Sequence, residues 1–194
     1  MKQPVTLAPR SSGHTPRRPR RKLGQSMVEF ALVLPVLLLV IFGIIEFCGI
    51  YESLNTVNYA AREGARVGAI IGPTLSNADT QILQAILNVT SNGGLLFSQV
   101  QKIEIFKSDE NGTVPALATG CAAAPNEDIY NGQGTACGTA NWPPSVRNAT
   151  FNAQDYLGIR ITFLYNWITS FVSASGGHLQ MTSVSVQLIE PQNY

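Results

Sequence analysis

The chain has 194 residues, of which 45% are hydrophobic, so it is long enough for one domain with a core plus an additional segment. Its formal net charge of +1 combines two unlike regions: residues 1–24 carry seven basic and no acidic side chains, and residues 25–194 carry six basic and twelve acidic ones. The basic cluster directly precedes an apolar run, which favours a membrane-orienting leader over a nucleic-acid-binding arm.

Residues 28–50 form an apolar run of sufficient length for one transmembrane helix, for which about 20 residues are enough. Glu29 and Glu46 lie at its ends, about 25 Å apart along a helix, so both can sit near the edges of a hydrocarbon layer of about 30 Å. The run is followed by Phe47 and Cys48 and not by the small residues of a signal-peptide cleavage site. We therefore expect a retained anchor, with residues 1–24 in the cytoplasm and residues 72–194 outside it.

The stretch GQSMVEFALVLPVLLLVIFGIIEF begins with Gly24 and contains Glu29, Phe30 and Pro35 in a characteristic order. The segment NYAAREGAR follows at residues 58–66. Residues 24–66 resemble the TadE-like family, small membrane proteins of the bacterial Tad (Flp, type IVb) pilus assembly system. The resemblance implies a location in the bacterial cytoplasmic membrane and partners among other pilin-like and Tad pilus assembly proteins.

The resemblance also implies a role for the glutamate in the first turns of the apolar run. In pilin-like proteins a prepilin peptidase cuts after a glycine, and a glutamate occupies the fifth mature position. A cut between Gly24 and Gln25 makes Glu29 the fifth residue and Phe30 the sixth, where the Flp and TadE-like variants favour an aromatic side chain. Family members include both processed pseudopilins and proteins that remain membrane components, so cleavage stays open here.

A new amine at Gln25 would lie one helical turn from the carboxylate of Glu29, and the two charges can pair within the chain or between subunits. This pairing would explain why a charge is kept at the end of a membrane helix. The alternative is that Glu29 lies at the membrane interface, contacts water and has no further role.

The helix is expected to run over residues 25–71, because no proline follows Pro35 before Gly72 and Pro73 end it. Pro35 removes one backbone hydrogen bond and predicts a kink. Small residues in the helix suit close packing with other subunits, and the alternative is that lipid merely tolerates them. These residues are Gly43, Gly49, Gly64 and Gly68.

The remainder of the chain predicts a short helix and an antiparallel sheet. Apolar side chains recur at helical spacing over residues 78–89, and strand-like runs occupy residues 100–107, 156–165 and 180–189. In the last run Met181 is out of step with Val184 and Val186, which predicts a bulge. Together with the long helix this gives an α+β fold: a long, pilin-like N-terminal transmembrane helix followed by a small extracytoplasmic domain.

Residues 108–155 form a long connection without a clear secondary-structure pattern, and Cys121 and Cys137 lie inside it. Outside the cytoplasm these two residues are expected to form a disulfide, and free thiols are the alternative. Cys48 is expected to be a buried apolar residue of the helix and not a third partner.

The sequence lacks the usual signatures of catalysis and metal binding. The two histidines, His14 and His178, have no partners at ligand spacing, and neither a nucleophile elbow nor a phosphate-binding loop is present. We therefore expect no cofactor, no metal, no small-molecule substrate and no enzymatic activity.

The favoured interpretation is a TadE-like minor pseudopilin or membrane component that acts in pilus assembly by helix packing. One alternative is a membrane-anchored binding or adhesion module outside any filament, with Trp142 beside Pro143 and Pro144 as the surface to suspect, although Trp is more often a core residue. Another is an unrelated membrane-tethered enzyme. Copurifying pilus subunits would favour assembly over the binding module.

Overall fold

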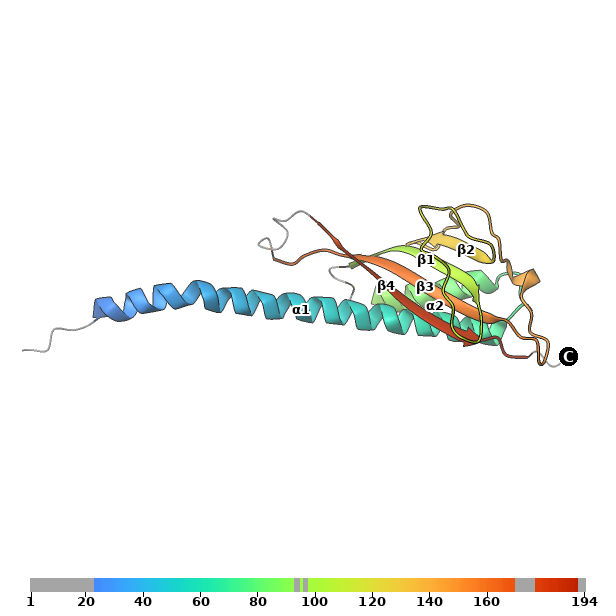
Figure 1. Ribbon diagram of the computed structural model, residues 1–194, viewed down its shortest axis with the longest axis horizontal. Coiled ribbons are helices and arrows are strands. Elements are labelled where there is room, and N and C mark those ends of the chain that lie inside the picture. The colour runs from blue at the N-terminus through green and yellow to red at the C-terminus, as the bar shows by residue number, and fades with distance from the viewer. Residues whose placement is uncertain (1–22, 93–94, 96–97, 170–176, 192–194) are drawn as a thin grey trace, which may run out of the picture. The chain divides into compact units, whose positions relative to one another are not determined.

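The computed structural model describes residues 23–92, 95, 98–169 and 177–191. The basic leader up to Lys22, including His14, lies outside the described residues. The chain divides into two compact units, Met1–Val40 and Ile41–Tyr194. Its elements, in chain order, are α1 (Leu23–Ile71), α2 (Ala78–Asn92), β1 (Ser98–Ser108), β2 (Glu127–Asn131), a 3-10 turn (Pro144–Val146), β3 (Tyr156–Tyr165) and β4 (Leu179–Leu188). Figure 1 labels the helices α1 and α2 and the strands β1 to β4.

Helix α1 is a single α-helix of 49 residues that continues through Pro35. Its C-terminus is where the sequence predicts it. Gly72 adopts a left-handed backbone conformation, with φ of 55°, and its N–H donates to the carbonyl of Gly68 at 2.9 Å. This is the backbone conformation with which glycine commonly ends a helix.

The four strands form one antiparallel sheet in the order β2-β1-β3-β4 (Figure 1). The predicted bulge in the last strand is wrong: β3 and β4 pair in continuous register from Tyr156↔Leu188 to Tyr165↔Leu179. The irregularity lies instead in β1, between Val100 and Lys102. The connection at residues 108–155 also differs from the expectation, because it contributes strand β2 and a 3-10 turn.

One face of the sheet packs against α2 and the part of α1 that belongs to the second unit, and this contact forms the core. Alternate residues of β3 point into it with no solvent exposure: Leu157, Ile159, Ile161, Phe163 and Tyr165. Two polar pairs join the helix to the sheet, Ser98 with Ser53 at 2.9 Å and Ser183 with Asn58 at 2.6 Å. The alternation in β3 was predicted, and it places its apolar side chains on the core face.

The opposite face of the sheet carries a buried network of charges. The guanidinium of Arg160 on β3 contacts Glu104 on β1 and Glu127 on β2, the latter at 3.0 Å. It also donates to the carbonyl of Pro115 at 2.6 Å, and Lys102 donates to the carbonyl of Ala118 at 2.7 Å. These bonds hold the segment between β1 and β2 over the sheet.

The end of the described chain returns to the helices. The N–H of Ile189 donates to the carbonyl of Asp155, and the N–H of Glu190 donates to the carbonyl of Ala69, both at 2.9 Å. Ala69 lies in the last turn of α1, where backbone carbonyls lack partners within the helix. The chain after β4 therefore supplies one of the hydrogen bonds that complete the C-terminus of α1.

Candidate membrane-anchor and subunit-packing segment

Helix α1 is long and apolar enough to cross a membrane, which makes it a membrane-anchor candidate. In the first unit its large apolar side chains are exposed, with Met27 at 76% and Leu32 at 74%. Soluble monomeric proteins rarely expose an apolar surface of this size to water. The surface therefore requires a membrane or another protein to cover it. The other exposed members in this unit are Val28, Phe30, Val33, Val36, Leu37, Leu38, Leu39 and Val40.

The site residues predicted from the sequence lie in the first turns of this helix. The side-chain amide of Gln25 donates to a carboxylate oxygen of Glu29 at 3.1 Å, one turn further along. Phe30 is 61% exposed, Pro35 is exposed, and a side chain added at Gly24 would meet nothing within 4 Å. The structure thus brings Gln25 and Glu29 together on an open helix surface.

In the second unit the acidic residue at the far end of the apolar run is enclosed by the protein. Glu46 is only 5% exposed, and its two carboxylate oxygens accept the backbone N–H groups of Ile168 at 2.9 Å and Thr169 at 3.2 Å. The hydroxyl of Tyr165 donates to the backbone carbonyl of Glu46 at 3.4 Å. The position of Glu46 in the sequence predicts a place at a membrane edge, but no local pattern indicates these partners.

The small residues at the end of α1 serve the fold of this chain. A Cβ atom added to Gly64 would lie 2.6 Å from the side chain of Ile86, and one added to Gly68 would lie 2.9 Å from Ile82. Gly49 is closed in by Tyr165. The expectation that all four helix glycines suit contacts with other subunits is therefore wrong for these three, and only Gly43 has open space around it.

A comparison with known protein families finds a match that lies within this helix. Residues 24–66 match the family model described as TadE-like protein. Over this segment the chain is similar to TadE-like proteins. No curated protein and no solved structure matches the chain. The TadE-like family implies a role in Tad pilus assembly and is generally non-catalytic.

The TadE-like segment, residues 24–66, combines two kinds of surface. Its first part is apolar and exposed, whereas Ala60, Ala61 and Ala65 near its end are fully buried against the domain. Next to these buried positions the helix also presents exposed residues: Tyr59 is 62% exposed, and Arg66 pairs with Glu63 at 2.6 Å. One segment therefore contains both the membrane-anchor candidate and a packing surface for its own domain.

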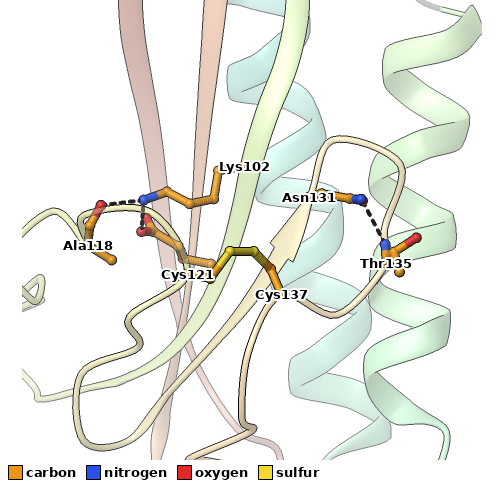
Figure 2. Close-up of a disulfide and its surroundings, with 7 residues drawn as sticks. Lys102, Ala118, Cys121, Asn131, Thr135 and Cys137 are labelled. Atoms are coloured by element: carbon orange, nitrogen blue, oxygen red, sulfur yellow. Dashed lines mark hydrogen bonds and ion pairs between the residues drawn. A yellow bond between two sulfur atoms is a disulfide. The ribbon is translucent and has the colours of Figure 1, made fainter.

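Outside the TadE-like segment, Cys121 and Cys137 are paired in a disulfide with their Cα atoms 5.2 Å apart (Figure 2). This Cα separation lies within the usual disulfide range. The bridge ties the segment after β1 to the chain that leaves β2, close to the Lys102–Ala118 contact drawn in Figure 2. Cys48 is unpaired and exposed, so the expectation that it is buried in the helix is wrong.

Trp142 is 1% exposed and belongs to the core. Its backbone N–H donates to Asp128 at 2.8 Å, and the guanidinium of Arg147 lies 4.7 Å from the centre of its ring. Arg147 also pairs with Asp79 at 2.5 Å, and Asp79 accepts the hydroxyl of Tyr130 at 2.9 Å. The suspected binding surface at Trp142 is therefore a buried structural cluster.

Burial shifts the titration of this cluster. Desolvation raises the pKa of the Asp128 carboxyl, and the backbone N–H of Trp142 partly opposes that shift. Desolvation, followed by the neighbouring Asp79 carboxylate, raises the pKa of Tyr130. Among the described residues no three His, Cys, Asp or Glu side chains lie close enough to hold a metal ion.

Proposed function

We propose that the protein is a minor pseudopilin or membrane component that acts in the assembly of a Tad-type pilus. The observation that carries the proposal is the exposed apolar surface of the TadE-like segment, which begins with a hydrogen-bonded Gln25–Glu29 pair. It acts without catalysis, by packing this helix against the helices of partner subunits. Its partners are the membrane, other pilin-like subunits and further Tad pilus assembly proteins.

The proposed topology places the N-terminus in the cytoplasm and residues 72–194 outside it. The support is the distribution of charge: the seven basic residues of the leader all precede the apolar run. Positive residues next to a membrane helix favour its cytoplasmic end. The protein is then a single-pass component of the bacterial cytoplasmic membrane, from which it can enter the fibre.

A prepilin peptidase is the proposed processing partner, with its cut between Gly24 and Gln25. The support is the open surroundings of Gly24 and the spacing that makes Glu29 the fifth mature residue. After the cut, the amine of Gln25 and the carboxylate of Glu29 lie one turn apart. In a helix bundle that excludes water, the glutamate needs such a partner, because an unpaired buried charge is strongly unfavourable.

The competing adhesion module lacks comparable support. Its suspected surface was Trp142 with Pro143 and Pro144, and the Trp142 side chain is packed beneath Arg147. The exposed side chains of the anchor, in contrast, have the composition that a membrane or a helix bundle requires. We therefore favour assembly through the helix over recognition through the domain.

The test is the N-terminal sequence and intact mass of the native protein, recovered from membranes of cells with and without the prepilin peptidase. We expect a form that begins at Gln25 only when the peptidase is present, and copurification of pilus subunits with that form. If the protein keeps its leader in both strains, processing is contradicted, and the protein is then a membrane component that remains a fixed scaffold. If no pilus component copurifies with the protein from either strain, the assembly role itself is contradicted.

A further inference from the structure

The depth of Glu46 in the bilayer follows from the charge pattern of α1. No charged residue lies between Glu29 and Glu46, and the helix between them rises by about 25 Å. If Glu29 is at the cytoplasmic edge of a hydrocarbon layer of about 30 Å, Glu46 lies about 5 Å inside the opposite edge. Tilting the helix places Glu46 deeper. The next charged residue, Glu52, is exposed.

The partners of Glu46 share its depth, because they are bonded to it. The carboxylate accepts the N–H groups of Ile168 and Thr169, in the chain that leaves β3. Near hydrocarbon, a free backbone N–H costs several kcal/mol, and so does an unpaired carboxylate. Here the two N–H groups and the Glu46 carboxylate are hydrogen-bonded to each other, so neither is left unpaired. The arrangement lets a non-helical backbone lie at a depth where water is scarce.

The side chains around this contact are those of a membrane interface. Trp167 is half-buried, with its ring edge-on to that of Tyr165, and Ile168 is 36% exposed. On the neighbouring helix turns Phe47 is 75% exposed and Tyr51 is 69% exposed. Trp and Tyr concentrate where the acyl chains meet the headgroups. No charged side chain occurs among residues 166–169.

We propose that residues 166–169 form a membrane-contacting foot of the exported domain, seated in the outer interface of the lipid bilayer and held there by Glu46. The inference rests on the membrane insertion of α1 in the proposed function. The occupant is lipid because the side chains next to Glu46 on the helix, Ile44, Ile45 and Phe47, are apolar and exposed, as is Ile168 of the foot itself. The contact restrains the domain against the bilayer surface before any partner subunit binds.

The test uses the full-length protein in phosphatidylcholine vesicles whose acyl chains carry bromine either close to the headgroups or close to the bilayer centre. Bromine quenches tryptophan on contact, and the chain has two tryptophans, Trp142 and Trp167. Trp142 is buried in the core, so its emission should be insensitive to both lipids. The difference between the wild type and Trp167→Phe isolates the emission of Trp167 without disturbing the core cluster.

We expect the shallow bromines to lower the emission of Trp167 by about twofold and the deep bromines to lower it less, as for an interfacial tryptophan. A Leu38→Trp variant with Trp167→Phe reports insertion of the helix, and deep bromines should quench it most. Quenching of the tryptophan at position 38 with none at Trp167 would overturn the foot and leave the anchor intact. Absence of quenching at both positions would overturn the membrane anchor, and the foot with it.

The role of Glu46 has its own variant. Glu46→Ala removes the acceptor of both N–H groups, so the shallow quenching of Trp167 should fall toward that of Trp142. The matched control is Glu52→Ala, which removes an exposed carboxylate of the same helix and should leave the quenching unchanged. Unchanged quenching of Trp167 in Glu46→Ala would overturn the proposal that Glu46 holds residues 166–169 in the interface.

Discussion

Gly64 of α1 lies so close to Ile86 of α2 that an added Cβ atom would come within 2.6 Å of the Ile86 side chain. Ile86 has no solvent exposure and is surrounded by the core, so it has little room to move. The glycine in the TadE-like segment thus sets the distance between the two helices. The same close approach continues one turn later at Gly68, which faces Ile82 and Leu157.

Gly64→Ala is expected to destabilise the domain. Overpacking of a tight core costs about 1 to 3 kcal/mol, and the better helix propensity of alanine offsets roughly 0.5 to 1 kcal/mol of that. Thermal unfolding of the full chain in detergent, followed by circular dichroism, measures the change. The matched control is Gly43→Ala, where an added Cβ meets nothing within 4 Å. Equal unfolding midpoints for the two variants would contradict the close packing.

Arg160→Met is expected to lower the free energy of unfolding by about 3 kcal/mol or more, because it leaves Glu104 and Glu127 buried without their main partner. Adding Glu104→Gln and Glu127→Gln should recover much of the loss, since the uncompensated charges are then gone. Chemical denaturation measures both variants. Arg66→Met breaks an exposed pair and should leave the denaturation midpoint unchanged. A small effect of Arg160→Met would contradict a structural role for the network.

The oxidised state of Cys121 and Cys137 is a prediction for the native protein. Alkylation of denatured, unreduced protein should modify only Cys48, and alkylation after reduction should modify all three cysteines. Mass spectrometry counts the labels. Reduction should also destabilise the domain by about 3 kcal/mol, because a loop of this length is no longer closed in the unfolded chain. Three labels without reduction would contradict the disulfide.

High pH should destabilise the domain through Tyr165. Desolvation, together with the nearby Glu46 carboxylate, raises the pKa of Tyr165 to about 12 from its ordinary 10.0. The folded state therefore favours the neutral phenol. Its contribution to stability is complete below pH 10 and is lost as the pH rises toward 12. Tyr165→Phe should remove that part of the decline in unfolding midpoint between these values, and an unchanged pH profile would argue against it.

Glu29→Gln tests the charge at the start of the helix. The proposed pairing with the amine of Gln25 requires a carboxylate, so the variant should reduce copurification of pilus subunits several-fold while its membrane level stays normal. Glu52→Gln is the matched control, because that carboxylate is also exposed on α1 but lies beyond the apolar run. Full copurification with Glu29→Gln would favour the alternative in which Glu29 merely contacts water.

The sequence was sufficient for the elements with strong local signals. Gly72 and Pro73 predicted the end of α1, and the alternation from Leu157 to Tyr165 predicted β3 at its observed limits. Strand β2 was missed because it has only five residues and includes Glu127 and Asp128, both buried through partners elsewhere in the chain. A short strand whose charges are neutralised by distant residues leaves no local pattern.

The same reason explains the errors in the candidate site. Glu46 and Ile168 are 122 positions apart, so no local pattern links the carboxylate to the N–H groups that enclose it. The two prolines after Trp142 suggest an exposed loop, yet Trp142 is buried in contact with Asp128 and Arg147. Residues of the first turns, such as Glu29, were proposed as site residues because their order along the chain is itself the signal, and their role stays a prediction.

The hydrogen bond from Glu190 to Ala69 constrains when the domain can fold. Ala69 emerges early in synthesis, whereas Glu190 and the strand before it emerge late. Strand β4 pairs with β3 at one edge of the sheet, and its Ser183 also bonds to α1, so the core stays incomplete until this strand has been synthesised. In the proposed topology, the anchor can enter the membrane while the rest of the chain is still unfolded. If the domain is exported as proposed, translocation and folding are ordered in time by the position of a single strand.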